Sequence, residues 1–240
     1  ILCLGEAAYC GTPGRLFDIT LNKAQLELAN KIIETGKPVI IVMLEGRPRV
    51  ITEIEPKAKG VLLGFLPGME GGDAIADVLF GDVNPSGKLP ITYPKTPNGI
   101  TLYDYKPIEK FDGNDYKPLY PFGFGLSYTS FEYSNLKISS QEITENDELI
   151  VKIDVKNTGN RAGKEVVQLY LTDKFCSVTR PNKQLKAFEK VMLKPGEVKT
   201  VEFKINKQQL SFIGQDNKRI VEPGDFVVTI QNHTANFELK

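Results

Sequence analysis

Short apolar runs alternate with helix-type patterns over residues 1–94. The runs at 1–5, 37–46 and 60–68 are almost continuously apolar, which is typical of strands in a parallel sheet that is covered on both faces. Parallel neighbours need a crossover between them rather than a tight turn. The alternation therefore predicts a partial α/β layer sandwich, with a mostly parallel sheet and right-handed crossovers.

Two of the connecting segments have the period of amphipathic helices. One helix is predicted over 22–36, where Gly36 stands in the position of a C-cap, and another over 70–81. A shorter helical stretch is expected at about 50–59. The apolar faces of the two longer helices consist of Leu26, Ala29, Ile32 and Ile33, and of Ala74, Ile75, Val78 and Leu79.

The period of the apolar positions changes to two from residue 131 onward. Short alternating segments separated by turns such as Pro195-Gly196 and Pro223-Gly224 predict an all-β sandwich of the fibronectin III/immunoglobulin-like kind. The chain has no tryptophan, which favours the fibronectin-like variety. The sequence therefore predicts three parts: the α/β portion at 1–94, a linker loop at 95–125 rich in Pro, Gly and Tyr, and the β-sandwich at 126–240.

Composition narrows the classes of function. Thirty basic residues balance thirty acidic ones, so no net charge favours nucleic acid, and no apolar run approaches the roughly 20 residues that span a bilayer. Cys3, Cys10 and Cys176 lack CxxC spacing, and His233 is the only histidine, so a zinc site is not expected. Neither a metal nor a cofactor is predicted.

Several stretches together resemble the C-terminal part of glycoside hydrolase family 3, of the β-glucosidase type. The resemblance rests on the segments 45–49 (EGRPR), 67–94, 119–139, 155–171 and 193–203. It implies a three-part enzyme in which a barrel carries an aspartate nucleophile, the α/β sandwich covers it and a fibronectin III-like domain follows. The chain starts within a predicted strand, so we expect the barrel and its nucleophile to be missing from this chain.

The opening loop is where the resemblance implies chemistry. Retaining glycosidases need two carboxyl groups about 5 Å apart, one as nucleophile and one as acid and then base. Many family members have a loop that reads Gly-Glu-x-x-Tyr-x-Glu-Thr-x-Gly, and its second glutamate is the acid/base. Here Gly11 occupies that position, so the role cannot be transferred, and Glu6 is expected to order the turn rather than to act in catalysis. By resemblance, Tyr9, Thr12 and Arg15 are the substrate-proximal residues.

A second loop, 45–49, follows the second predicted strand. Its position at the carboxyl end of the sheet is where open α/β sheets place ligands, but an ion pair between Glu45 and Arg47 that holds the loop is the expected role. A phosphate site is not predicted, because the glycines of the opening loop lack P-loop or dinucleotide-binding spacing.

Three functions therefore stand side by side. The chain is the C-terminal portion of a retaining β-glucosidase-like hydrolase, inactive alone; or it is a non-catalytic carbohydrate-binding or scaffolding module; or it belongs to a degenerate family member in which Gly11 marks lost hydrolysis. In the first case its partners are a β-glucoside or oligosaccharide and the N-terminal barrel. The resemblance suggests a secreted or periplasmic location.

Overall fold

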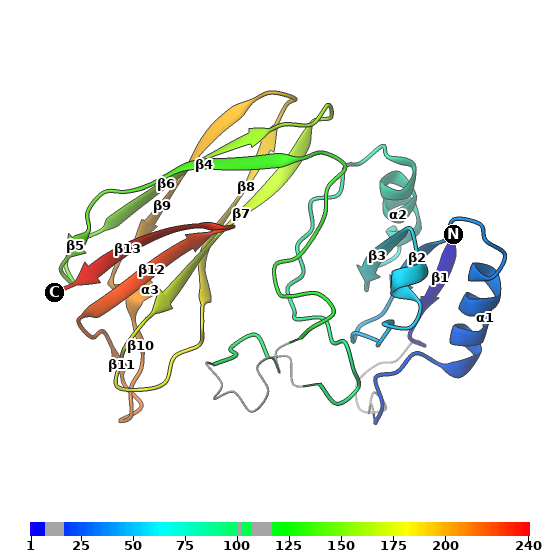
Figure 1. The fold of residues 1–240 in the computed structure, drawn as a ribbon, viewed down its shortest axis with the longest axis horizontal. Helices are drawn as coiled ribbons and strands as arrows, with labels where there is room; N and C mark the ends of the chain where they lie inside the picture. Colours follow the sequence, from blue (N-terminus) through cyan, green and yellow to red (C-terminus); the bar gives the residue numbers. More distant parts are fainter. Residues whose placement is uncertain (8–16, 100–101, 107–116) are drawn as a thin grey trace. The chain divides into compact units, whose positions relative to one another are not determined.

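The computed structural model describes residues 1–7, 17–99, 102–106 and 117–240. These residues divide into two compact units (Figure 1). The described residues of Ile1–Val83 and Leu89–Leu102 belong to the first unit, together with 117–124. The second unit consists mainly of Gly125–Lys240 and includes the short segment Asn84–Lys88.

The first unit contains a parallel three-stranded sheet in the order β1 (Leu2–Gly5), β2 (Ile40–Leu44) and β3 (Gly60–Phe65). Helix α1 (Lys23–Ile33) connects the first two strands, and helix α2 (Gly71–Phe80) follows the third. The three continuous apolar runs therefore form adjacent parallel strands, as predicted. A register shift between Met43 and Leu44 interrupts the β2–β3 pairing at its carboxyl end.

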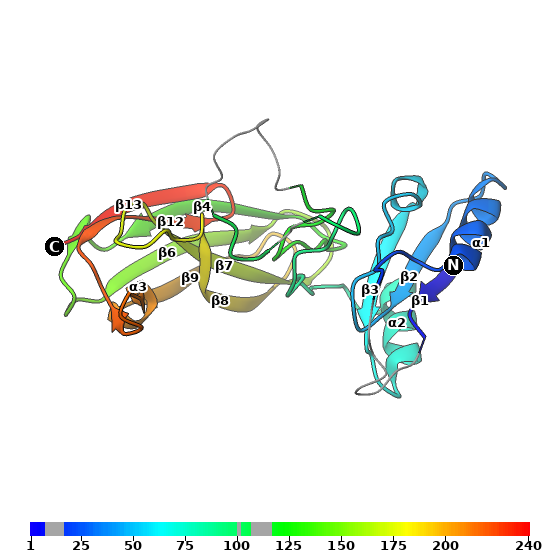
Figure 2. The same cartoon turned by 90° about the horizontal axis from the view of Figure 1, so that it is seen from below.

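The two helices pack on opposite faces of this sheet, a division that Figure 2 makes visible. One face carries the core of the unit, where α1 contributes buried Ala29. On the other face, Ile75 of α2 lies over Gly64, where an added Cβ would be 3.4 Å from its Cδ1 atom. The main core residues on the first face are Leu2, Leu4, Ile41, Met43, Ile51, Ile54 and Tyr93.

Helix α1 begins and ends close to the predicted positions. Asn22 is its N-cap and accepts a hydrogen bond of 2.9 Å from the Ala24 N–H group. The prediction of Gly36 as C-cap is wrong, because the C-cap is Glu34 in a right-handed conformation. The Thr35 hydroxyl donates to the Ile32 carbonyl at 2.7 Å, and Gly36, with φ +74°, then turns the chain away.

The segment between β2 and β3 differs from its prediction. Only the 3₁₀ turn Glu55–Lys57 (η1) forms where a helical stretch was expected at 50–59. Pro56 fits the first turn of a helix, but its missing N–H group cannot continue a longer one from Val50. Ile51 and Ile54 are nevertheless fully buried, so their spacing reflects the core and not a complete helix.

The second unit is a sandwich of a five-stranded sheet, in the order β5-β13-β12-β7-β8, and a three-stranded sheet, β4-β6-β9. Neighbouring strands are antiparallel except for the parallel pair β5 and β13. Alternate residues of the two sheets meet in one core, which confirms the predicted fibronectin III-like class. The strands are β4 (Phe131–Ile138), β5 (Glu142–Ile143), β6 (Leu149–Asn157), β7 (Gly163–Asp173), β8 (Gln184–Leu193), β9 (Val198–Ile205), β12 (Gly224–Ile230) and β13 (His233–Leu239), with α3 (Lys207–Leu210), β10 (Phe212–Ile213) and β11 (Arg219–Ile220) between them.

After its excursion from the first unit, the chain returns to it at residues 117–124. The Leu119 N–H group donates to the Tyr93 carbonyl at 2.9 Å, and the Tyr120 and Phe124 rings stack at 5.0 Å. The described helices include none that is both long enough and apolar enough to span a bilayer.

Candidate functional site

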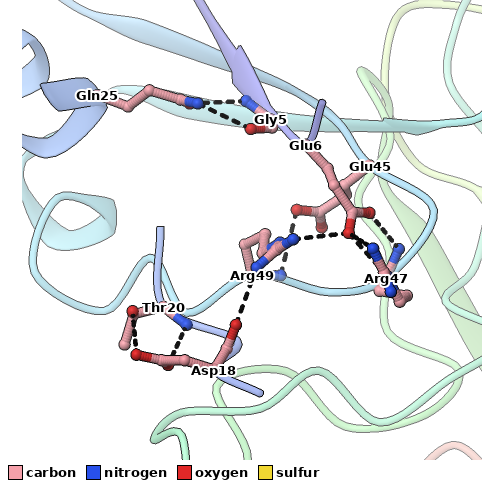
Figure 3. Close-up of polar contacts among 8 residues, drawn as sticks. All are labelled: Gly5, Glu6, Asp18, Thr20, Gln25, Glu45, Arg47 and Arg49. Carbon is pink, nitrogen blue, oxygen red and sulfur yellow. Dashed lines mark hydrogen bonds and ion pairs between the residues drawn. The ribbon is translucent and has the colours of Figure 1, made fainter. Parts of the chain in front are cut away.

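The first two strands end side by side, and the loops that leave them form the candidate site (Figure 3). The Glu6 N–H group donates to the Leu44 carbonyl at 2.9 Å, so the chain stays beside β2 for one residue after β1 ends. Gly5 permits this approach, because a Cβ there would lie 1.9 Å from the Leu44 oxygen and its φ is +156°. The Gln25 carboxamide also bonds both peptide groups of Gly5 at 2.9 Å.

Glu6 is held by two guanidinium groups, and we call Glu6, Arg47 and Arg49 the Glu6 cluster. Its Oε1 atom accepts hydrogen bonds from Arg47 Nε at 2.7 Å and from Arg49 Nη2 at 2.6 Å, and it also contacts Arg47 Nη2. Its second oxygen accepts from the Arg47 N–H group at 3.3 Å. The side chain is only 4% exposed.

This environment fixes the charge of Glu6. Desolvation raises the pKa of the carboxyl, but the hydrogen bonds from Arg47 and Arg49 and the charge of Arg49 more than offset it, so the pKa lies below its usual value. The group is therefore an ionised hydrogen-bond acceptor at neutral pH. A carboxylate in this state orders the loops and has no proton to donate to a leaving group.

Arg49 connects both ends of the opening loop. Its Nη2 atom binds Glu6 before the loop, and its Nη1 atom donates to the Asp18 carbonyl after it, at 3.0 Å. The second end is ordered further, since the Asp18 carboxylate accepts from the N–H and hydroxyl groups of Thr20 at 2.8 Å. The Val50 N–H group donates to the Ile19 carbonyl at 2.9 Å, which joins this end to the β2 loop.

Glu45 lies beneath the cluster with a side chain that water does not reach. The residue is 1% exposed, and its carboxyl group accepts from the Tyr93 hydroxyl at 2.7 Å and from the Arg49 N–H group at 3.2 Å. Desolvation raises its pKa to about 7, although these hydrogen bonds and the charge of Arg49 act in the opposite direction. Its pKa suits acid catalysis, but its burial keeps it from any substrate.

The predicted ion pair between Glu45 and Arg47 is wrong. Arg47 turns instead to Glu6, which is 41 residues away in sequence, and Glu45 pairs with Tyr93. Tyr9, Gly11, Thr12 and Arg15 lie outside the described residues. Sequence reasoning missed Asp18, Gln25, Arg49 and Tyr93; the second arginine of the EGRPR motif was the available signal for one of them.

The described residues hold no group of three or more His, Cys, Asp or Glu side chains that could bind a metal ion. The two arginines at the site are satisfied by Glu6, so they do not form an open phosphate site either. The arrangement can hold two loop ends at a fixed separation at the carboxyl edge of a parallel sheet.

Comparisons with known proteins agree with this architecture. The family described as "Glycosyl hydrolase family 3 C-terminal domain" matches residues 1–128, and the "Fibronectin type III-like domain" matches residues 165–234. Together the fold and the loop site define a C-terminal two-domain portion of a glycoside hydrolase. The chain belongs to glycosyl hydrolase family 3.

Full-length relatives show how much of such an enzyme the chain represents. It is 41% identical to a "Beta-xylosidase" of Formosa agariphila, over 96% of this chain and 33% of the relative. It is 43% identical to a "Periplasmic beta-glucosidase" of Salmonella typhimurium, over 89% of this chain and 30% of the relative. The chain thus spans about a third of the length of these relatives and matches their C-terminal part.

A crystal structure of a β-glucosidase from Listeria innocua in complex with glucose resembles the chain with a TM-score of 0.91 and 36% identity. The similarity covers 99% of this chain and 36% of that one. A structure of the same enzyme, carrying a D270A substitution, contains laminaribiose.

Proposed function

We propose that this chain is the C-terminal portion of a β-glucosidase-like hydrolase that cleaves β-linked glucosides by a retaining two-carboxylate mechanism. The family assignment and the β-glucosidase names of several relatives support this proposal. The nucleophile comes from the N-terminal barrel, so the chain is inactive when isolated. Xylosides are the alternative substrates, because two relatives are described as β-xylosidases.

The observation that carries the proposal is the way in which Arg49 and Glu6 hold the opening loop. A loop that brings groups to a substrate bound by another domain needs fixed ends, because small displacements of reacting groups reduce rates strongly. Arg49 bonds to Glu6 before the loop and to Asp18 after it. In the complete enzyme this clamp sets the position from which Tyr9, Thr12 and Arg15 reach the sugar.

The chain's own carboxyl groups at this site do not supply the acid. Glu6 is ionised and bound to two arginines, and Glu45 is buried under the loops. Gly11 stands where the family's acid/base glutamate is expected. The proton for the leaving group therefore comes from another residue of the complete enzyme, or hydrolysis is lost. The second candidate function, a degenerate member that binds glucosides without cleaving them, is favoured by Gly11 alone.

Two assays test the proposal. The purified chain is incubated with p-nitrophenyl β-glucoside and p-nitrophenyl β-xyloside, and we expect no turnover; release of nitrophenol by this chain contradicts the missing nucleophile. The polypeptide that joins a barrel to this chain is then assayed with and without Gly11→Glu. A positioned general acid contributes about 10²–10⁴-fold, so a gain below about tenfold means that position 11 does not hold the acid. Activity before the substitution excludes the degenerate function.

A further inference from the structure

The second unit contains a groove that the hydrolase site does not use. It has a volume of about 790 Å³ and lies where the start of β4, the β12–β13 turn and residues 125–130 meet. This volume is in the range of small-molecule sites. All of the residues that line it belong to the second unit.

The deep side of the groove is a closed polar network. Glu165 accepts a hydrogen bond from the Tyr133 hydroxyl at 2.9 Å and pairs with Lys88 Nζ at 3.3 Å. Lys88 also donates to the Gly125 carbonyl at 2.8 Å. Glu165 is 4% exposed and its charge is matched by Lys88, so this part of the groove has no free charge with which to attract an ionic ligand.

The rim of the groove offers short polar side chains beside the exposed Glu132 carboxylate. Ser130 and Asn232 are exposed, and within the described part of the chain their side chains form no hydrogen bond. A hydroxyl and a carboxamide can each donate and accept, as sugar hydroxyls do. Leu126, which is 73% exposed, and the half-buried Phe131 ring add apolar surface against which the C–H face of a pyranose can pack.

We propose that this groove binds a neutral β-linked oligosaccharide, as a second sugar site on the fibronectin III-like unit. The choice of a sugar rests on the proposed function, since it supplies the glycans near which the chain acts. The matched charges of Lys88 and Glu165 give an anionic glycan no attraction, and the exposed Glu132 carboxylate repels it. The mixture of short polar side chains with modest apolar surface fits hydroxyl groups better than the large apolar anchors of a peptide.

The test is a titration of the isotope-labelled 240-residue chain with laminaritetraose and with cellotetraose, followed through backbone amide shifts. We expect saturable changes at residues 126–133 and 231–233, with a Kd below about 10 mM for at least one sugar. Ser130→Ala and Asn232→Ala should each weaken binding at least about threefold, and the double variant about tenfold. Asn236→Ala, an exposed change on β13 outside the groove, is the matched control and should leave the Kd unchanged.

Absence of shifts at 20 mM sugar overturns the proposal, as do shifts confined to the first unit. Equal Kd values for the wild type and the double variant, with native spectra for both, overturn it as well. Tighter binding of a tetragalacturonate than of the neutral sugars contradicts the argument from matched charges. These results are distinguishable from a failure of the proposed function, which appears as hydrolysis by the chain and not as a change in binding.

Discussion

The Tyr93 hydroxyl lies 2.7 Å from a carboxyl oxygen of Glu45 and 2.9 Å from the Arg49 carbonyl. A hydroxyl carries one proton and cannot donate fully to both acceptors. The ionised Glu45 carboxylate accepts from Tyr93, whereas a protonated Glu45 can donate to Tyr93 and leave the Tyr93 proton for the Arg49 carbonyl. The geometry is compatible with the protonated form, which the raised pKa of about 7 favours below neutral pH.

This pair predicts a pH dependence of stability. Glu45 has an ordinary pKa of 4.5 in the unfolded chain and a pKa of about 7 in the folded one. Between these values the folded state holds a proton that the unfolded state has released, so the free energy of unfolding falls as pH rises. One pKa unit corresponds to roughly 1.4 kcal/mol, and we expect a loss of about 3 kcal/mol from this group between pH 4.5 and 8.

The variant Glu45→Gln isolates this contribution, because an amide keeps the shape and the hydrogen bonds but does not titrate. Urea unfolding at pH 5 should give the two proteins similar stability, and at pH 8 the variant should be the more stable one. A stability difference that does not change between these pH values would exclude a protonated Glu45.

The two arginines of the Glu6 cluster should not be equivalent. Arg49→Ala removes a bond to each end of the opening loop, whereas Arg47→Ala removes side-chain hydrogen bonds to Glu6, which precedes the loop. We expect the free energy of unfolding to fall by about 2–4 kcal/mol in Arg49→Ala. The decrease should be smaller in Arg47→Ala, because Glu6 keeps one arginine partner in each variant but only Arg49→Ala also loses the bond to Asp18. Thermal or urea unfolding measures both.

Hydrogen exchange distinguishes the clamp from a general loss of stability. In Arg49→Ala, the amides of Thr20 and Val50, which bond to Asp18 and Ile19, should exchange faster than in Arg47→Ala. Arg49→Lys keeps the charge but has a single nitrogen, which cannot reach both ends, so it should behave like the alanine variant. If Arg49→Lys exchanged as slowly as the wild type, the charge of residue 49 alone would explain the stabilisation of the loop ends.

The ion pair between Lys88 and Glu165 in the groove should have a large coupling energy. Lys88 and Glu165 side chains are 14% and 5% exposed, whereas the surface pair Lys152 and Glu202 is 52% and 41% exposed. A double-mutant cycle with Lys88→Met and Glu165→Gln should give a coupling energy of about 1–3 kcal/mol. The same substitutions at Lys152 and Glu202 serve as control and should give less than about 0.5 kcal/mol. Equal couplings would mean that water screens both pairs alike.

Gly5 should tolerate no side chain. Gly5→Ala places a Cβ 1.9 Å from the Leu44 oxygen at a φ of +156°, so the strands must separate, and we expect a loss of more than about 3 kcal/mol. Gly60→Ala is the control, because no atom lies within 4 Å of its added Cβ. That change should alter stability by less than about 1 kcal/mol. Both are measured by thermal unfolding.

The elements were predictable from the sequence where one local pattern decides them. The run around Ile40–Leu44 is apolar because both sheet faces are covered, and the period-two segments form sandwich strands because one face of each meets the core. The stretch at 50–59 is not predictable in this way, because buried Ile51 and Ile54 have helical spacing while Pro56 limits the helix to one turn. The spacing of apolar residues indicates which of them are buried, and it does not by itself determine the backbone conformation.

The contacts of the site were less predictable, because the fold brings together side chains that are far apart in the sequence. Glu45 and Arg47 are near in sequence, and pairing them was the simplest expectation. The chain instead brings Glu6 to the β2 loop, where Arg47 finds it, and Tyr93 reaches Glu45 from 48 residues away. The parallel pairing of β1 with β2 brings Glu6 to the β2 loop. That pairing cannot be read from the opening segment or from the EGRPR segment alone.

The carboxamide of Gln25 imitates a peptide group, since it donates to the Gly5 carbonyl and accepts from the Gly5 N–H group. A helix side chain thereby occupies the place that the backbone of a further strand would take beside the last residue of β1. Any additional strand on that side must stop short of Gly5 or displace Gln25. Gln25 thus blocks the addition of a strand beside Gly5, at the end of the sheet where the loops of the site begin.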